Sequence, residues 1–435
     1  MENTFRRNFL KSSTIVAGAV ASGLYAGETD DTVKAVLVGC GGRGTGAAFD
    51  FLKNPNTKII AVGDVFPDQV EKALKNFNLP AEAGFTGFTS YRQAIDYAVA
   101  HGATLAILTT PPGFRPIHYR YAVEKGLNCF LEKPCCVDAL GYRMLMDINK
   151  LAEEKNLKIG VGMQRRHQLS YLNGVADILD GKYGDVRYMR VFWNMGGIPV
   201  RGTGEEPTEM ERQIRNRYYF VWLCGDNILE QHVHNLDVGN WVLGKGDPLF
   251  HPIKCNGMGG RQARKATPRA GQIFDHHFVE YIYEDGRRMY SQSRQMPGTW
   301  SVVNEYVVGS KGEGPVAGGQ QRMFVDGKPT GYTPDRREKG KNPYEVEHTD
   351  LVAAIRGNLK FHEGWAGATA SLIGIMGRMA TYSGREITWE EAMNKGKTYM
   401  IYENHDALTL QSNPPVLPDE NGLYPLPVPG VSEEV

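Results

Sequence analysis

The sequence predicts a two-domain α/β protein, in which a doubly wound parallel-sheet domain precedes an α+β domain with a largely antiparallel, open sheet. The chain has 435 residues, more than a single hydrophobic core usually serves. Short apolar runs alternate with helical patterns in the first third of the chain, which favours parallel strands joined by helices. Strand-like runs at hairpin spacing dominate the next part, which favours antiparallel pairing.

The expected organisation has four parts. They are an export signal over 1–26, a first α/β domain over 27–158, a second α+β domain over 159–400 and a C-terminal tail over 401–435.

Paired arginines mark the N-terminus. Arg6 and Arg7 precede Phe9-Leu10-Lys11, and a weakly apolar stretch rich in Ala, Gly and Val occupies 14–26. This order is typical of a twin-arginine signal, which exports proteins already folded; the alternative is a basic tail with a chance arginine pair. We therefore expect a protein that is periplasmic or otherwise exported through the Tat pathway.

Composition excludes several classes of partner. Lysine plus arginine equals aspartate plus glutamate, 49 against 49, so no global charge attracts nucleic acid or anionic lipid. The chain has no run of about 18 apolar residues, so we expect no membrane association once the signal is removed. Six irregularly spaced cysteines without a CxxC pair are expected to be buried thiols.

A glycine-rich turn follows the first apolar strand, at 33–38. The turn reads GCGGRG and precedes a helical pattern over 45–53, which is the GxGxxG context of a dinucleotide-binding Rossmann domain. In such a turn Gly39 permits the bend, Gly41 lets a pyrophosphate approach the backbone, and Gly44 allows close helix packing. The expected cofactor-binding residues here are Gly39, Gly41, Gly42, Arg43 and Gly44.

An acidic residue ends the second apolar strand, at 58–63. Asp64 lies 20 residues after Gly44, where a carboxylate accepts hydrogen bonds from the ribose hydroxyls and repels a 2′-phosphate. No basic residue follows in Val65-Phe66-Pro67, so the sequence favours NAD over NADP. The alternative for Asp64 is an ordinary loop acid or helix cap.

The alternation continues to about residue 131. Helices are expected near 67–76, 91–101 and 118–125, and strands at 105–108 and 128–131. Ligands of such sheets bind at the carboxyl ends of the strands. Five further residues fall at those ends and are expected in the cofactor site: Thr110, Pro111, Glu132, Lys133 and Pro134.

At Glu132-Lys133-Pro134 the chain resembles the Gfo/Idh/MocA family, which includes glucose-fructose oxidoreductase and inositol 2-dehydrogenase. The resemblance rests on the glycine turn, Asp64, Thr110-Pro111, this tripeptide, the segment 162–166 and the segment 230–237. It implies hydride transfer between a nicotinamide and a sugar or cyclitol carbon. It also implies Lys133 as the catalytic lysine, Pro134 and Gln164 in the cofactor site, and homo-oligomers paired through the second-domain sheet.

The chemistry of alcohol oxidation supports a role for Lys133 independently. A group must take or guide the hydroxyl proton, and a lysine at a strand end in a partly dry cleft suits that task. The alternative is a solvated surface lysine.

The second constellation of the resemblance lies in 225–237. The family shows an aspartate, a histidine four residues later and an aspartate three further; Glu230, His234 and Asp237 match these positions, with Glu replacing the first Asp. If the stretch opens a helix, the three share one face. The resemblance then implies that all three are catalytic, with His234 as the proton-transfer partner of Lys133 and Asp237 orienting it.

An extra histidine raises the question of a metal. Glu230, His232 and His234 are residue types that ligate transition metals. His232 and His234 would diverge on a helix, so we predict no metal site; the alternative is an extended segment on which they converge.

The second domain offers candidate sugar-binding residues. Strands are expected at 186–193, 278–283, 288–294 and 305–308, helices at 344–357 and 366–383, and an extended proline-rich end from 413. Aromatic faces and hydrogen-bond donors suit a sugar, although aromatic residues also serve as core. The expected substrate-binding residues are Arg166, Trp193, Tyr218, Trp222 and His232.

Three functions fit these residues. The first is an NAD-dependent oxidoreductase acting on a sugar, glycoside or cyclitol hydroxyl, with a tightly bound cofactor recycled in place because free NAD is not expected outside the cytoplasm. The second is an NAD-dependent glycosidase that oxidises, eliminates, hydrates and reduces, with His232 or Glu230 as the extra base. A non-catalytic sugar-binding relative is the third.

Overall fold

The computed structural model describes residues 31–435 except 266, 268, 319–320, 326–327 and 333–339. The expected twin-arginine signal over 1–26 lies outside the described residues. Among the described helices, none is long and apolar enough to cross a membrane.

Six parallel strands form the first sheet, in the order β3-β2-β1-β4-β5-β6. Their bounds are β1 Val33–Val38, β2 Thr57–Asp64, β3 Gly84–Thr86, β4 Leu105–Leu108, β5 Asn128–Leu131 and β6 Ile159–Val161. This strand order is that of a Rossmann domain, which confirms the predicted fold of the first part. The apolar runs predicted as β1, β4 and β5 have the predicted bounds, whereas β3 is three residues long and was not predicted.

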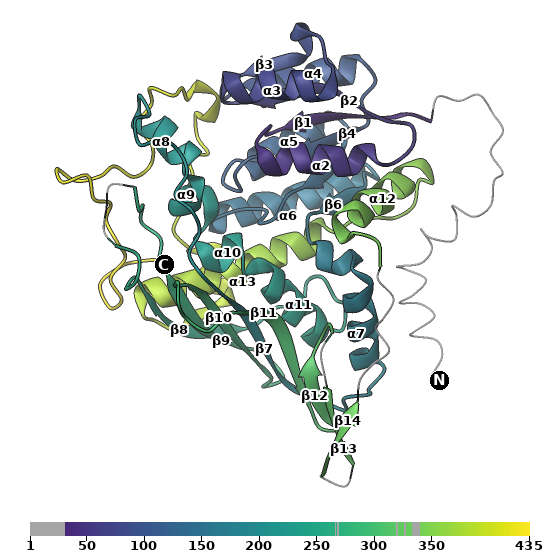
Figure 1. Cartoon of the computed structure of the whole chain (residues 1–435), viewed down its shortest axis with the longest axis vertical. Coiled ribbons are helices and arrows are strands. Elements are labelled where there is room, and N and C mark those ends of the chain that lie inside the picture. Colours follow the sequence, from purple (N-terminus) through teal and green to yellow (C-terminus); the bar gives the residue numbers. More distant parts are fainter. Residues whose placement is uncertain (1–30, 266, 268, 319–320, 326–327, 333–339) are drawn as a thin grey trace.

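Helices cover both faces of this sheet (Figure 1). Those from the first domain are α2 Gly42–Leu52, α3 Pro67–Phe77, α4 Ser90–Ala100, α5 Arg115–Glu124 and α6 Ala139–Glu154. One further helix, α12 (Pro343–Arg356), comes from late in the chain and packs against α2. The helix over 344–357 was predicted, but its return to the first domain was not.

The first domain was expected to end at residue 158, but it includes one further strand, β6. β6 pairs with β5 through Cys129–Ile159, Phe130–Gly160 and Leu131–Val161, so it belongs to the first sheet. Its three residues are too few for an apolar run to identify them as a strand.

The second sheet has nine strands, in the order β14-β13-β12-β11-β7-β10-β9-β8-β15. All neighbouring pairs are antiparallel except β7 with β10, which confirms the largely antiparallel prediction. The strands are β7 Val186–Met195, β8 Lys254–Gly260, β9 His276–Ile282, β10 Arg288–Gln295, β11 Val302–Gly309, β12 Gly312–Pro315, β13 Gln321–Val325, β14 Lys328–Tyr332 and β15 Ile387–Thr388.

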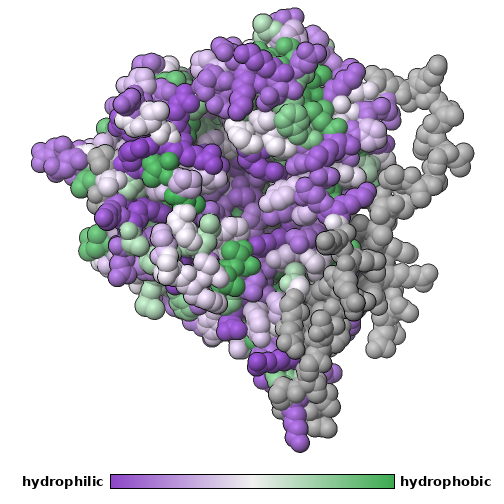
Figure 2. Space-filling model, viewed as in Figure 1, coloured by the Kyte–Doolittle hydropathy of each residue, from purple (hydrophilic) through white to green (hydrophobic). Residues whose placement is uncertain are grey.

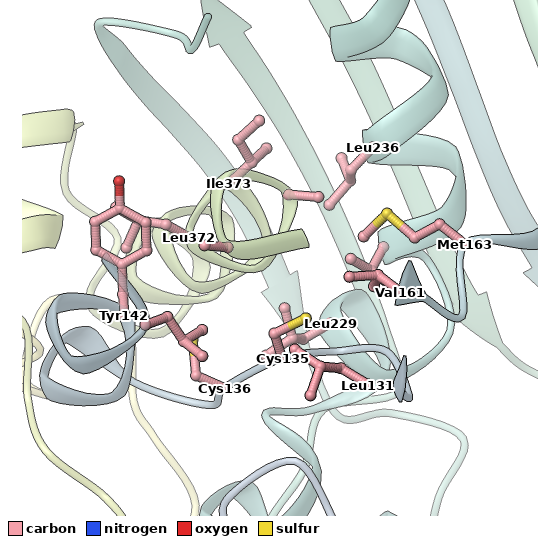
Figure 3. Close-up of a cluster of buried hydrophobic side chains, with 14 of the residues drawn as sticks. Leu131, Cys135, Cys136, Tyr142, Val161, Met163, Leu229, Leu236, Leu372 and Ile373 are labelled. Atoms are coloured by element: carbon pink, nitrogen blue, oxygen red, sulfur yellow. The ribbon is translucent and has the colours of Figure 1, made fainter. Parts of the chain in front are cut away.

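One face of the second sheet is covered by α10 (Asn227–Glu230), α11 (Val233–Leu243) and α13 (Gly364–Ser383) (Figure 1). α13 is buried along almost its whole length and also packs against α6. Figure 3 shows the resulting core, in which Leu131 of β5, Leu229 of α10 and Leu372 of α13 converge. One continuous hydrophobic core therefore joins the two domains.

Short helices and turns complete the chain. They are α7 Leu169–Leu179, α8 Glu209–Arg215, α9 Val221–Cys224, α14 Trp389–Asn394, η1 Ala81–Ala83, η2 Gln164–His167, η3 Arg217–Tyr219 and η4 His405–Ala407. All six cysteines are buried and free, as predicted.

The tail over 401–435 has little regular structure, as predicted, but it is packed. The Gly430 amide donates to the Ser383 carbonyl at 2.7 Å, and the Lys397 amide donates to the Glu434 carbonyl at 2.9 Å. The side chain of Glu434 is buried. The tail is therefore part of the folded body.

Candidate active site

The glycine turn between β1 and α2 has the geometry that its sequence predicts. Gly39 adopts φ +97°, and a Cβ there would lie 2.6 Å from the Thr110 amide nitrogen. A Cβ on Gly44 would lie 1.9 Å from the Gly39 carbonyl oxygen. Both positions therefore require glycine for the bend and the packing of the protein itself.

Gly41 and Gly42 differ, because they face open space. A Cβ on either residue would have no atom within 4 Å, and both residues line a cavity of about 730 Å³ at the start of α2. That volume lies within the usual range of ligand pockets. The protein itself leaves room for a side chain at Gly41 and Gly42. Glycines that leave this space open at the N-terminus of a helix fit the binding of a pyrophosphate there.

Asp64 lies in the same cavity, at the end of β2. Its Oδ2 accepts from the Cys40 amide at 2.7 Å and its Oδ1 from the Phe66 amide at 3.0 Å. Burial raises the pKa of this carboxyl group, whereas the two backbone hydrogen bonds lower it. The carboxylate is held in one orientation at the position that meets the ribose of a dinucleotide.

Thr110 and Pro111 also line the cavity, and a buried arginine supports their loop. Arg115, only 1% exposed, donates hydrogen bonds to the carbonyl oxygens of Thr110 and Pro134. It ties together the loops after β4 and β5. Sequence reasoning missed Arg115, because a basic residue at a helix start resembles a surface residue in the sequence.

The guanidinium of Arg43 is hydrogen-bonded to two carboxylates. Its guanidinium donates to Glu132, and its Nη2 donates to Glu347 of α12 at 3.2 Å. Burial and the nearby Glu132 raise the pKa of Glu347 well above its usual range. Arg43 lines the cavity, but its charged group holds α12 to the loop after β5.

Lys133 joins the two domains at the next position along the loop. Its Nζ donates to the main-chain carbonyl of Glu230 at 2.5 Å and lies 3.7 Å from Glu230 Oε1. Arg217 Nη1 lies 3.2 Å from the same Oε1. Glu230 Oε2 is buried and has no hydrogen-bond partner in the described part of the chain. Two cations therefore share one carboxylate, and one carboxylate oxygen is left for a ligand.

His234 lies near this group, at the start of α11, and is 6% exposed. Burial, followed by the positive charge of Lys133, lowers its pKa well below the usual range, so the imidazole is neutral at pH 7. Within the described residues its Nδ1 has no partner, and its ring stacks on Trp193 with centroids 6.0 Å apart. A neutral imidazole with a free nitrogen can accept or relay a proton.

The expected helical face of Glu230, His234 and Asp237 is wrong. α10 ends at Glu230 and α11 begins at Val233, so the first residue lies on a separate helix. Asp237 does not orient His234: its two oxygens accept from Arg166 Nη2 and Nε at 2.7 and 2.9 Å. Arg166 was expected to bind substrate, but its guanidinium is engaged in this bidentate pair with Asp237.

Two other expected substrate residues are buried in the core. Trp222 is 1% exposed and donates its indole N–H to Gln213 Oε1 at 2.7 Å. His232 is fully buried between Asn235 and Ser291, and burial lowers its pKa to about 3. Neither presents a face to a substrate. In the described residues no group of three His, Cys, Asp or Glu side chains is arranged to hold a metal ion.

Two predicted residues remain available at the site. Tyr218 lines the cavity and lies under the guanidinium of Arg217, 4.3 Å from its ring centroid. Gln164 follows β6, and its buried Oε1 lacks a partner within the described ranges. In Figure 2 the surface is hollowed between the first domain and the segment of α8 and α9, and hydrophilic residues border the hollow.

Comparisons with known proteins agree with this geometry. Residues 33–163 match the model of the Gfo/Idh/MocA family, described as an oxidoreductase family with an NAD-binding Rossmann fold. A curated relative, a glycosyl hydrolase family 109 protein of Porphyromonas gingivalis, is 27% identical over 179 residues. The match spans 38% of this chain and 36% of that relative.

Solved structures resemble most of the chain. The aldose-aldose oxidoreductase of Caulobacter crescentus, complexed with glycerol, has a TM-score of 0.62 at 17% identity, covering 82% of this chain and 99% of that one. The myo-inositol 2-dehydrogenase of Lactobacillus plantarum has 0.60 at 20% identity, with 82% and 99% covered. The WlbA dehydrogenase of Bordetella pertussis, in complex with NADH and UDP-GlcNAcA, has 0.61 at 15% identity, with 82% and 98% covered. At these identities the likeness establishes the fold.

Fold and site together define a two-domain protein whose first domain has the NAD-binding Rossmann fold. Residues 33–163 are similar to the NAD-binding domain of Gfo/Idh/MocA oxidoreductases.

Proposed function

We propose that this protein oxidises a hydroxyl of a sugar, glycoside or cyclitol by hydride transfer to an NAD that stays bound between turnovers. The observation that carries the proposal is the position of Lys133. It follows the carboxyl end of β5, on the same side of the sheet as the glycine turn after β1. Its Nζ contacts Glu230 of the second domain. A hydroxyl between the domains would thus meet the lysine that guides its proton and the hydride acceptor together.

The cavity fits NAD better than NADP. Asp64 lines it, and Arg215, one of the arginines that also line it, already pairs with Glu211 at 2.8 Å and with Asp68 at 3.1 Å. The cofactor, when bound, supplies the hydride acceptor. The residues expected to hold it are the glycine turn, Asp64, Thr110, Pro111 and Gln164.

Proton transfer is the task of the side chains around Lys133. Lys133 guides the hydroxyl proton, Glu230 fixes the ammonium group through its main-chain carbonyl, and neutral His234 accepts the proton as the hydride leaves. Asp237 acts through Arg166 rather than through His234, so its role is to position the start of α11.

Export supports an internally recycled cofactor. A twin-arginine signal over 1–26 would carry the folded protein, with cofactor inside, to a compartment where free NAD is not expected. A retained cofactor must be re-reduced or re-oxidised in place, so the net reaction would be redox-neutral. We further propose a homo-oligomer, because the face of the second sheet opposite α11 and α13 exposes large apolar residues such as Met258 and Phe278.

An NAD-dependent glycosidase is the second candidate, favoured by the glycosyl hydrolase family 109 relative. After oxidation to a ketone, this reaction needs a base for the acidified C–H proton. Glu230 Oε2, buried and unpartnered within the described chain, suits that role. His232 does not, because both its nitrogens are hydrogen-bonded in the core.

Incubation of the purified protein with a panel of sugars, cyclitols and aryl glycosides tests the proposal. We expect the absorbance of reduced nicotinamide to appear on the enzyme with one class of substrate. Release of the aglycone without net redox change would select the glycosidase. Tight sugar binding without reduction or hydrolysis for any bound compound would instead indicate a non-catalytic relative and contradict the proposal.

A further inference from the structure

The C-terminal tail over 401–435 reaches the cofactor cavity of the first domain. His405, in η4, lines that cavity together with Asp64 and the glycine turn. The next residue anchors it: Asp406 accepts from Tyr91 OH at 2.9 Å and from Arg92 Nε at 2.6 Å, both on α4. The tail residue His405 therefore lines the same cavity as Asp64, although the two residues are some 340 positions apart in the sequence.

The imidazole of His405 is enclosed but not satisfied. The side chain is 4% exposed, and its ring centroid lies 5.5 Å from that of Phe114, 6.0 Å from that of His118 and 6.2 Å from that of Phe88. Neither ring nitrogen has a hydrogen-bond partner within the described part of the chain. Burial lowers the pKa of His405 to about 4, so a neutral ring with one N–H donor and one acceptor nitrogen faces this space. Such unmet groups indicate a ligand.

Asp64 identifies which part of the ligand would lie there. A carboxylate after the second strand meets the adenosine ribose of a dinucleotide, so the end of the cavity with Asp64 is the adenosine end. Phe66, whose amide donates to Asp64, and Phe88, whose ring lies beside that of His405, also line the cavity, whereas Lys133 does not. Aromatic rings and an imidazole with two free nitrogens match the face and edge of a purine.

The tail also holds α8 across the cavity. Arg215 of α8 lies over the Phe66 ring, 3.8 Å from its centroid, and pairs with Asp68. From the outside, Tyr424 of the tail donates to Glu209 of α8, and Gln213 donates to the Val416 carbonyl at 2.8 Å. The cavity is therefore closed by one segment of the second domain, which the tail braces.

We propose that the C-terminal tail completes the adenosine half of the cofactor site, with His405 contacting the purine and the brace on α8 slowing the release of the dinucleotide. This inference rests on the dinucleotide binding of the proposed function but not on the substrate or the reaction. It supplies a structural reason for a cofactor that stays bound.

Binding of adenosine monophosphate to the full-length, cofactor-stripped protein tests the role of His405. We expect His405→Ala to weaken this binding by roughly tenfold, as for the loss of one buried hydrogen bond and ring contact, while nicotinamide mononucleotide binds as to wild type. His405→Gln, which keeps a donor and an acceptor, should recover part of the affinity. His101→Ala, at the exposed histidine that caps the C-terminus of α4, is the matched control.

The brace is tested separately by the rate at which bound NAD leaves the holoenzyme on dilution. Tyr424→Phe removes the hydrogen bond to Glu209 without changing the ring, and we expect several-fold faster release. Affinities of His405→Ala and His405→Gln within twofold of wild type, or equal weakening of both mononucleotides, would overturn the role of His405. Unchanged release from Tyr424→Phe would overturn the brace. Failure of wild type to bind adenosine monophosphate would contradict the dinucleotide site itself, and thereby the proposed function as well.

Discussion

Lys133 Nζ donates a hydrogen bond to the main-chain carbonyl of Glu230 at 2.5 Å, across the junction of the two domains. Lys133 follows the fifth strand of the Rossmann sheet, and Glu230 ends α10 on the second sheet. The ammonium group is thus held by an acceptor that no side-chain substitution removes. We therefore expect this lysine to serve chemistry between the domains rather than stability.

Lys133→Met should abolish turnover while leaving NAD bound, because the methionine keeps the length of the side chain and loses only the ammonium group. Turnover and cofactor content of the purified variant are the measurements. Lys72→Met, at an exposed lysine of α3, is the control and should behave as wild type. Activity of Lys133→Met within a few-fold of wild type would sink the catalytic assignment.

Gly41→Ala and Gly44→Ala should differ in their effect on the stability of the protein without cofactor. The Cβ on Gly41 meets nothing within 4 Å and its φ of −64° suits alanine, so we expect an unchanged melting temperature and greatly weakened NAD binding. A Cβ on Gly44 would overlap the Gly39 carbonyl, so that variant should be destabilised or fail to fold. Normal NAD affinity in Gly41→Ala would refute the placement of the pyrophosphate.

Asp64→Ala should weaken NAD retention, because the carboxylate that meets the ribose hydroxyls is lost. The same variant should also discriminate less against NADP, since the charge that repels a 2′-phosphate is gone. Binding titrations with both cofactors measure this. Unchanged NAD occupancy would refute the ribose role, and Asp96→Ala, at an exposed aspartate of α4 that does not line the cavity, is the comparison.

Arg115→Met should destabilise the protein by about 2–5 kcal/mol, because it leaves the buried carbonyls of Thr110 and Pro134 without a donor. Chemical denaturation measures the change in the free energy of unfolding. Arg120→Met, at a half-buried arginine on the same helix, should change it by less than about 1 kcal/mol. A similar small effect for Arg115→Met would show that the arginine does not support the two loops.

Two buried histidines should contribute a loss of stability as the pH drops below about 6.5, whereas the raised pKa of Glu347 acts in the opposite direction. Burial lowers the pKa of His348 and of His232 to about 3, so the unfolded chain binds protons below pH 6.5 that the folded chain does not. His167 has the opposite sign: Glu363 and Asp350 raise its pKa to about 10, and its contribution is complete below 6.5 and lost only as the pH rises toward 10. It therefore does not offset the acid effect.

His348→Phe isolates one of these groups, since the ring packs between Phe51 and Phe130 with both nitrogens unpartnered in the described chain. We expect the slope of unfolding free energy against pH to decrease by about 1.4 kcal/mol per pH unit between pH 6 and 4. An unchanged slope would mean that His348 titrates normally in the folded protein.

Much of the fold could be predicted because its signals are local. The GxGxxG turn, Asp64 and the buried runs of β4 and β5 each combine a short apolar strand with a residue type that the backbone or ligand requires. The strands β3 and β6 have three residues each, too few to show a period. The return of α12 to the first domain depends on contacts more than 300 residues apart, as between Arg43 and Glu347.

The site was predictable in part for the same reason. The motif residues Lys133, Glu230 and His234 do gather at the domain junction, but their partners are set by tertiary packing. A break between α10 and α11 turns Asp237 toward Arg166, and burial closes His232 and Trp222 to a ligand. The role of His405 could not be predicted from the sequence. A histidine in the C-terminal tail shows no pattern that indicates contact with a pocket whose other residues lie some 340 positions earlier in the chain.

The nicotinamide content of the purified protein tests the central claim most directly. The mature protein would be isolated, dialysed extensively and denatured, and the supernatant assayed for NAD(H) and NADP(H). We expect near-equimolar NAD(H) from wild type and much less from Gly41→Ala. Absence of any nicotinamide from the dialysed wild-type protein would contradict a retained, internally recycled cofactor.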